Sequence, residues 1–327
     1  MCIRDSYGAY AKEEHGPDAA YEDKVMNYNE RAVANGDELF FFHKTENAIC
    51  KVDKEGKMST IITFDEIKKA WEMDDIEETG WLIRLDYYDG YVYFTYYLQD
   101  SYFLSRINVE NGNVDEPYTD SAFYCAIKDG YLYYETPVDN DYEYFDVYRV
   151  KIESQINIDK KELYLEKFIG KTYSRAKDFY AEIIYDDSYY LEAVYNEYGE
   201  KSIRKNGNRY LLCTDENGMY TLKKCEKTDQ KQESNETQYM TISEHVLEYN
   251  SYGDKLFYLK QENGNTELIQ TDLNGNNEKV LKQYADCYES VAYTDPTYIF
   301  SIMVCEDKVV VMYEDQESNP KYDVVGY

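Results

Sequence analysis

The sequence is poor in basic residues, and this shortage argues against two classes of partner. The 327 residues include 35 Lys+Arg against 65 Asp+Glu, a formal net charge of −30 at pH 7. Affinity for nucleic acid comes mainly from Lys and Arg at the phosphates, so we expect no nucleic-acid partner. The charge also disfavours an anionic membrane surface. No apolar run reaches the roughly 18 residues that a membrane span needs, so we expect no membrane insertion.

Sequence motifs for catalysis and metal binding are absent as well. The seven cysteines form no C-x-x-C, and His15, His43 and His245 do not have metal-ligand spacing. Neither a G-x-S-x-G nucleophile elbow nor a phosphate-binding P-loop occurs. We therefore predict no catalytic residues, no cofactor-binding residues, no metal ligands and no cofactor. The ligand-binding residues stay unknown.

Two turn sequences carry the oxygen ligands that calcium uses, at residues 215–218 and 272–277. Neither matches the consensus calcium loop with its distal Glu. Both lie where a hairpin turn is expected, and turns select Asp, Asn and Gly. Turn formation is therefore the favoured role for both.

What the sequence does contain is a strand–turn–strand pattern that recurs six times. Each copy has a short apolar strand, a turn with Gly, Asp or Asn, and a strand rich in Tyr, Phe or Val. The copies cover residues 31–42, 82–94, 123–134, 181–191, 246–258 and 298–312. Asp-Gly and Asn-Gly supply the positive φ angles of a tight turn, so each copy predicts a β-hairpin.

A second polar turn follows several of these hairpins, as at residues 53–56, 110–112 and 272–275. A third and a short fourth strand around each such turn give four antiparallel strands per unit, as in a propeller blade. The turns recur on average every 54 residues or so, close to the roughly 40–50 of propeller repeats. We predict an all-β fold, a six-bladed β-propeller of four-stranded antiparallel blades. A seven-bladed propeller is the alternative, because residues 207–222 could form a further hairpin.

Two insertions and the two chain ends complete this prediction. Residues 63–66 fit a capping box, which predicts a short helical insertion near 63–74. Residues 226–238 are almost wholly polar and indicate a solvated loop, and 154–178 form another insertion. Residues 25–28 could supply the fourth strand of the last blade beside residues 322–325, which would remove exposed sheet edges.

Residues 1–6 resemble a short sequence that recurs as adapter read-through at the start of metagenomic reading frames. We therefore expect residues 1–20 to be disordered or artefactual, and residues 21–327 to form a single β-propeller domain. A signal or anchor would then be missing from this fragment. The expected location is extracellular or cell-surface.

The repeats resemble a family of bacterial β-propeller domains of unknown function related to the YWTD propellers of the low-density-lipoprotein receptor. Residues 89–94, 129–134, 103–108 and 271–275 carry this resemblance. The Tyr-Trp-Thr-Asp motif itself does not occur, and several blades have long insertions. The resemblance implies a propeller on or outside a bacterial cell and transfers no catalytic residues.

The 40 tyrosines are the most unusual feature of the composition. They recur as adjacent pairs at 96–97, 133–134 and 189–190, and strand neighbours point to opposite faces. We expect one tyrosine of each pair to pack between blades. Surface tyrosines would suit protein or glycan recognition.

From these features we predict a monomeric, non-catalytic, extracytoplasmic binding or scaffolding domain that uses one propeller face. Its ligand would be an unknown protein or glycan. The alternative is a carbohydrate-active hydrolase or lyase with carboxylates at the central channel. The missing motifs favour a protein that is not an enzyme.

Overall fold

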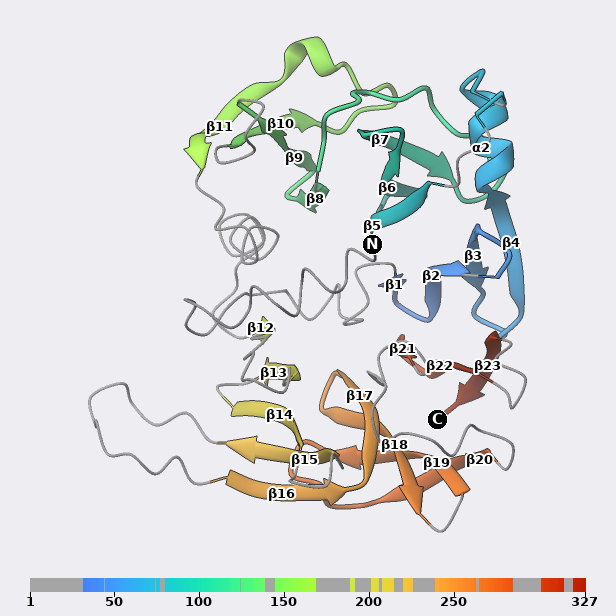
Figure 1. Ribbon diagram of the computed structural model, residues 1–327, viewed down its shortest axis with the longest axis vertical. Coiled ribbons are helices and arrows are strands. Elements are labelled where there is room, and N and C mark those ends of the chain that lie inside the picture. The colour runs from blue at the N-terminus through green and yellow to red at the C-terminus, as the bar shows by residue number, and fades with distance from the viewer. Residues whose placement is uncertain are drawn as a thin grey trace. The chain divides into compact units, whose positions relative to one another are not determined.

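The chain folds into antiparallel β-sheets in a computed structural model (Figure 1). The structure describes residues 32–43, 45–73, 75–76, 80–123, 125–138, 145–168, 189–191, 201–205, 208–214, 220–225, 239–262, 265–284, 301–314 and 320–327. The chain divides into two compact units, one formed by Asn29–Tyr185 and the other by Asp186–Tyr327 together with Met1–Tyr28.

The unit of residues 29–185 contains three sheets, in each of which strands that are consecutive in the sequence are neighbours. The first sheet comprises β1 (Ala32–Asn35), β2 (Glu38–His43), β3 (Ala48–Val52) and β4 (Met58–Thr63). The second comprises β5 (Trp81–Tyr88), β6 (Tyr91–Leu98) and β7 (Ser101–Asn108). The third comprises β8 (Cys125–Lys128), β9 (Tyr131–Pro137), β10 (Phe145–Lys151) and β11 (Glu162–Phe168). A short 3-10 helix, η2 (Ile158–Lys160), precedes β11.

The unit that contains residues 186–327 has three further sheets with the same sequential order. The first comprises β12 (Tyr189–Leu191), β13 (Lys201–Lys205), β14 (Asn208–Thr214), β15 (Tyr220–Cys225) and β16 (Tyr239–Glu244). The second comprises β17 (Val246–Tyr252), β18 (Lys255–Glu262), β19 (Asn265–Asp272) and β20 (Lys279–Tyr284). The third comprises β21 (Ser301–Val304), β22 (Lys308–Glu314) and β23 (Pro320–Gly326).

The predicted hairpins are confirmed wherever both of their strands are described. Tyr88 pairs with Tyr91 across a two-residue loop, in which Asp89 and Gly90 have φ angles of 48° and 82°. The β8–β9 hairpin repeats this geometry at Asp129 and Gly130, with φ angles of 51° and 75°. Two successive positive φ angles match the right-handed twist of the flanking strands. The β1–β2, β17–β18 and β21–β22 hairpins also form, and the first strand of the hairpin at 181–191 lies outside the described residues.

The predicted helix is also confirmed, as α2 (Phe64–Ala70). Thr63 caps it: the Thr63 Oγ1 accepts from the Glu66 N–H at 3.2 Å, and the Glu66 Oε2 accepts from the Thr63 N–H at 2.8 Å. Phe64 stacks on Tyr96 with 4.2 Å between ring centroids, and the following Trp71 stacks on Phe94 at 6.0 Å. The helix is therefore held by an apolar core that it shares with β6.

Three pairs of neighbouring sheets within a unit contact each other chiefly through their first strands, whereas the five-stranded sheet contacts β17 through β15. In the first unit β5 contacts both β1 and β8, and in the other β17 contacts β21. A Cβ atom on Gly275, in the turn between β19 and β20, would lie 2.9 Å from Ile242 Cγ2 in β16. The turn of one sheet therefore rests directly on the outer strand of the preceding sheet.

The fold is mostly β, as predicted, although no sheet closes on itself among the described residues. The hairpin expected at 207–222 forms as β14–β15, inside a five-stranded sheet. The insertion expected at 154–178 contains η2 and β11, the latter being the outer strand of its sheet. Residues 1–20, 25–28 and 226–238 lie outside the described residues, and the single domain over 21–327 stays a prediction.

Candidate functional site

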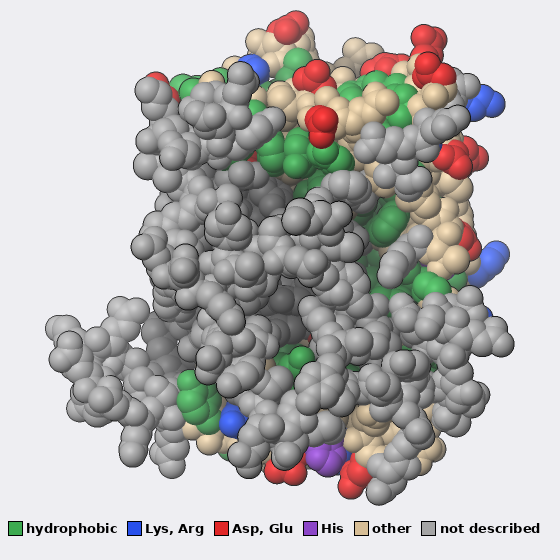
Figure 2. Space-filling view, in the orientation of Figure 1, with side chains coloured by type: hydrophobic (Ala, Val, Ile, Leu, Met, Phe, Trp, Pro, Cys, Tyr) green, Lys and Arg blue, Asp and Glu red, His purple; other side chains and the backbone are tan. Residues whose placement is uncertain are grey.

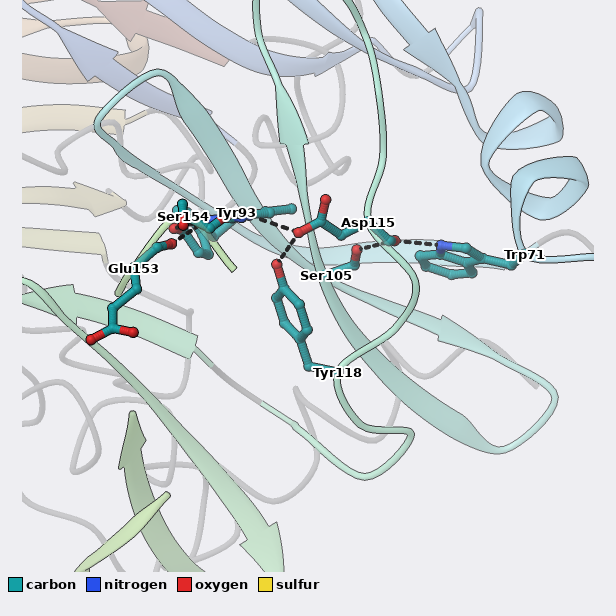
Figure 3. A network of polar contacts seen from close by, with 8 residues as sticks. Trp71, Tyr93, Ser105, Asp115, Tyr118, Glu153 and Ser154 are labelled. Carbon is teal, nitrogen blue, oxygen red and sulfur yellow. Dashed lines mark hydrogen bonds and ion pairs between the residues drawn. The ribbon is translucent and has the colours of Figure 1, made fainter. Parts of the chain in front are cut away.

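A connected polar site among the described residues of the first unit is built around Arg106, on β7, whose exposed fraction is only 3%. Figure 3 labels the residues around it. Its Nε donates to Asp115 Oδ2 at 2.8 Å. One terminal nitrogen donates to the Tyr93 hydroxyl and to the Glu153 carbonyl, both at 3.2 Å. The other donates to the Ser154 carbonyl at 2.6 Å. Four of the five N–H groups of this guanidinium therefore have partners within the chain.

Asp115 joins this arginine to two other parts of the unit. Its Oδ2 accepts a second hydrogen bond, from the Tyr118 hydroxyl at 2.6 Å. Its backbone carbonyl accepts from Ser105 Oγ at 2.7 Å and from Trp71 Nε1 at 2.9 Å. One residue thereby connects β7 with the end of helix α2, as Figure 3 shows.

The segment that carries Asp115 takes the place of a fourth strand beside β7. The Asp115 N–H donates to the Arg106 carbonyl at 3.0 Å. Further along, the Tyr118 N–H donates to the Leu104 carbonyl at 2.8 Å, and the Leu104 N–H donates to the Thr119 carbonyl at 3.1 Å. These ladder bonds hold the segment of Asp115 and Tyr118 alongside β7, where the Asp115 carboxylate meets Arg106 Nε.

Burial and the neighbouring charges set the ionisation of this site. Burial opposes the charged form of Arg106, but hydrogen bonding to Tyr93 and Asp115 and the nearby Tyr118 raise its pKa above the usual value. Burial and the hydrogen bond to Asp115 raise the pKa of Tyr118, and burial raises that of Tyr93. Both tyrosines are therefore neutral at pH 7.

The Arg106 site, meaning Arg106 with Asp115, Tyr93 and Tyr118, can hold two sheets and a helix together but offers little to a ligand. Four of the five guanidinium N–H groups are occupied, and the guanidinium carbon lies 4.1 Å from the centroid of the Tyr91 ring. A cation over an aromatic ring is favourable when desolvated. The site is therefore a buried hydrogen-bonded contact that joins β7 to the chain segment following β10.

A second polar feature recurs in both units, on the first strand of a sheet. Asp86 on β5 accepts from the N–H of Ile127 on β8 at 2.9 Å. Asn250 on β17 donates from Nδ2 to the carbonyl of Ile302 on β21, also at 2.9 Å. Each side chain also accepts from the N–H of the residue that follows it, at 2.8 Å.

These two bridges occupy equivalent positions in their hairpins. Asp86 pairs with Tyr93, and two further residue pairs separate it from the two-residue loop. Asn250 pairs with Phe257 in the same register. Both bridging residues are nearly fully buried, at 5% and 0% exposed. We call these contacts the Asp86 bridge and the Asn250 bridge.

The two histidines among the described residues each have a local structural setting. His43 ends β2, is buried, and its Nδ1 accepts from the Glu46 N–H at 3.2 Å; burial lowers its pKa. His245 lies between β16 and β17 with a positive φ of 60°. His15 is outside the described residues. Within the described part of the chain no group of three His, Cys, Asp or Glu could hold a metal ion.

The turn at 272–277 forms as the composition predicts. The Asp272 carboxylate accepts from the N–H groups of Asn274 and Asn276 at 2.8 and 2.9 Å, and these hydrogen bonds lower its pKa. Residues 215–218 lie outside the described residues. No helix of the described residues is long and apolar enough to cross a membrane.

The tyrosine pairs follow the prediction only in part. Tyr96 is 1% exposed and Tyr97 is half-buried, as expected for strand neighbours. Tyr133 and Tyr134 are both buried: the Tyr133 ring packs against Tyr164 of β11, and the Tyr134 ring stacks on Tyr148 of β10. The side chains of 189–190 are outside the described set.

The polar residues that organise both units were missed by the sequence analysis. Arg106 and Asp115 carry no motif, and their contact depends on a chain segment that doubles back along β7. The one available signal was an arginine among the large apolar residues of β7. Figure 2 shows acidic side chains scattered over the visible described surface, in keeping with the net charge of −30.

Comparison with known proteins gives matches among solved structures alone. No family model matches the chain, and no curated protein matches it. A structure of prolyl endopeptidases matches with a TM-score of 0.46 and 11% identity, over 99% of this chain and 52% of that one. A post-proline cleaving enzyme from Rickettsia typhi matches with a TM-score of 0.45 and 12% identity, over 98% and 53%. The β-propeller domain of the Trilobed protease from Pyrococcus furiosus matches with a TM-score of 0.29 and 13% identity, over 90% and 79%.

These matches correct the predicted function. The prediction of a non-catalytic extracytoplasmic binding or scaffolding domain, with a carbohydrate-active enzyme as the alternative, is wrong. The matched structures are peptidases or domains of peptidases. The chain spans about half the length of the first two.

Proposed function

We propose that this chain is the β-propeller part of a peptidase-type protein. In this proposal its sheets form six blades around one axis, next to the part of the protein that hydrolyses peptide bonds. The relation to YWTD propellers, the extracellular or cell-surface location and the monomeric state are further proposals.

The observation that carries the propeller is the recurrence of the Asp86 and Asn250 bridges. Each bridge links the first strand of one sheet to the first strand of the next, at one hairpin register. Successive sheets joined at their first strands are arranged as blades are. The sequential antiparallel order of every described sheet supports the same architecture.

The proposed substrate class draws on the charge of the chain. Acidic residues exceed basic residues by 65 − 35 = 30. A surface potential of one sign raises the local concentration of oppositely charged substrates. Peptides with Lys or Arg are therefore the substrates that we expect to approach fastest, with an advantage that falls as salt rises.

The test is a hydrolysis assay on the complete reading frame that encodes this chain. Fluorogenic peptides and fluorogenic glycosides would be offered in parallel at low and high salt. We expect cleavage of peptides, with the cationic members losing their advantage at high salt. Cleavage of glycosides, or no cleavage of any peptide by a folded product, would overturn the proposal.

A further inference from the structure

The turn between β19 and β20 meets β15 at one unusual pair, Lys224 and Asn274. Lys224 Nζ donates to the Asn274 side-chain oxygen, Oδ1, at 2.6 Å. The lysine is only 6% exposed, whereas Asn274 lies on the surface. Among the described residues no carboxylate lies within ion-pair distance of Lys224. A buried ammonium thus has a neutral amide oxygen where a counter-ion would be expected.

Asn274 is followed by Gly275, the sequence in which asparagine deamidates most readily. Glycine has no side chain to shield its nitrogen. The Gly275 N–H donates to the Asp272 carbonyl at 3.0 Å, and a turn opening that breaks this bond frees the nitrogen for attack. In this reaction the Gly275 nitrogen bonds to the Asn274 Cγ and ammonia leaves, which forms a succinimide. Water then opens the ring to Asp or isoAsp, so the net change is Asn plus water to Asp plus ammonia.

The position of Lys224 favours the first step and the Asp product. A cation on the amide oxygen makes Cγ more electrophilic, and it stabilises the oxyanion that forms when the nitrogen attacks. After conversion, the new carboxylate would take the hydrogen bond of the amide oxygen and pair with the buried ammonium. Charge-assisted hydrogen bonds are shorter and stronger than those to a neutral acceptor.

The docking of the turn gives this change a structural consequence. The Tyr210 hydroxyl of β14 donates to the Leu273 carbonyl at 2.8 Å, and Gly275 lies against Ile242 of β16. The turn is therefore part of the contact between the sheets β12–β16 and β17–β20. From these contacts we propose that Asn274 is a self-modification site, whose deamidation to Asp strengthens this contact as the protein ages.

Asn111 is the matched control within the same chain. It is also exposed and is followed by Gly112, which has a φ of 70°. Its side-chain oxygen accepts from the Asn113 N–H at 2.9 Å, a backbone donor without charge. A general tendency of Asn-Gly turns to deamidate would affect both positions alike.

The experiment is timed peptide mapping by mass spectrometry on the full chain at mildly alkaline pH, with fragmentation that separates Asp from isoAsp. We expect Asn274 to convert several-fold faster than Asn111, mostly to Asp, with release of ammonia. Lys224→Met should slow the conversion at Asn274 and leave Asn111 unchanged. Lys224→Gln, which retains a donor without the charge, gives the same comparison if the Met variant does not fold.

Stability supplies a second readout that does not depend on the rate. Asn274→Asp should raise the urea concentration at the midpoint of unfolding in the otherwise wild-type protein. It should give no such rise in a protein that also carries Lys224→Gln. Asn111→Asp adds the same charge and should show no gain. Equal conversion at the two asparagines, no gain from Asn274→Asp, or a cross-linked 224–274 peptide that has lost ammonia would each overturn the proposal.

Discussion

Removing the Asp115 carboxylate should destabilise the first unit far more than removing a carboxylate from an exposed ion pair. In Asp115→Ala the Arg106 guanidinium, 3% exposed, loses the one anionic partner that it has among the described residues, and the Tyr118 hydroxyl loses its acceptor. Breaking one side of a buried pair costs about 3–5 kcal/mol. The Asp115 side chain is 37% exposed, which lets water reach the site, so we expect about 3 kcal/mol.

The assay is urea unfolding, with hydrogen exchange over residues 81–168 to assign the loss to this unit. Asp115→Asn separates the charge from the hydrogen bonds, because the amide oxygen can still accept, and should cost less than Asp115→Ala. A double-mutant cycle with Arg106→Met should show strong coupling, since both changes remove the same interaction.

The control for this prediction is Glu162→Ala. Glu162 pairs with Arg149 at 2.9 Å, but the two side chains are 59% and 34% exposed. Exposed pairs contribute about 0–1 kcal/mol. If Asp115→Ala costs no more than Glu162→Ala, the Arg106 site does not hold the sheets together and the reasoning fails.

Three further changes test the helix cap, the turn contact and the bridge. Thr63→Ala should cost about 1 kcal/mol in urea unfolding, because it removes the cap of α2. Hydrogen bonds from the Thr63 backbone N–H and, second, from its hydroxyl lower the pKa of Glu66, so their contribution to stability is present above the unfolded pKa and lost as pH falls through the folded one. Thr63→Ala removes only the hydroxyl and should raise the pKa of Glu66 part of the way; no rise at all would contradict a contribution from the hydroxyl. Gly275→Ala should lower the free energy of unfolding more than Gly90→Ala, because both glycines have positive φ but only a Cβ at 275 would meet a neighbour, Ile242. Equal losses of stability in the two variants would refute this contact. So would a Gly275→Ala protein that regains no stability when Ile242→Ala is added. Asp86→Ala should lower the free energy of unfolding by about 1–3 kcal/mol and speed hydrogen exchange at the Ile127 amide. An unchanged exchange rate would contradict the Asp86 bridge.

The hairpins could be predicted from the sequence because their signals are local. Asp89-Gly90 and Asp129-Gly130 specify a turn by backbone sterics alone, and the flanking residues specify strands. The capping box of α2 is equally local, since Thr63 and Glu66 are three residues apart.

The polar sites could not be predicted, because they join residues far apart in the sequence. The Arg106 site depends on a return of the chain beside β7, and Arg106 contacts Ser154 from 48 residues away. The Asp86 bridge crosses 41 residues to Ile127. Nothing in the spacing of these residues indicates that they meet. The burial of both Tyr133 and Tyr134 was missed for a related reason, since period-two alternation assumes that one face of a strand is open to solvent.

An experimental structure of the whole chain tests the central claim most directly. We predict that the first strands β1, β5, β8, β12, β17 and β21 all face one axis, with the Asp86 and Asn250 bridges linking neighbours around it. Sheets of the two units that face separate axes, or bridges that are absent while the hairpins remain, would contradict the propeller.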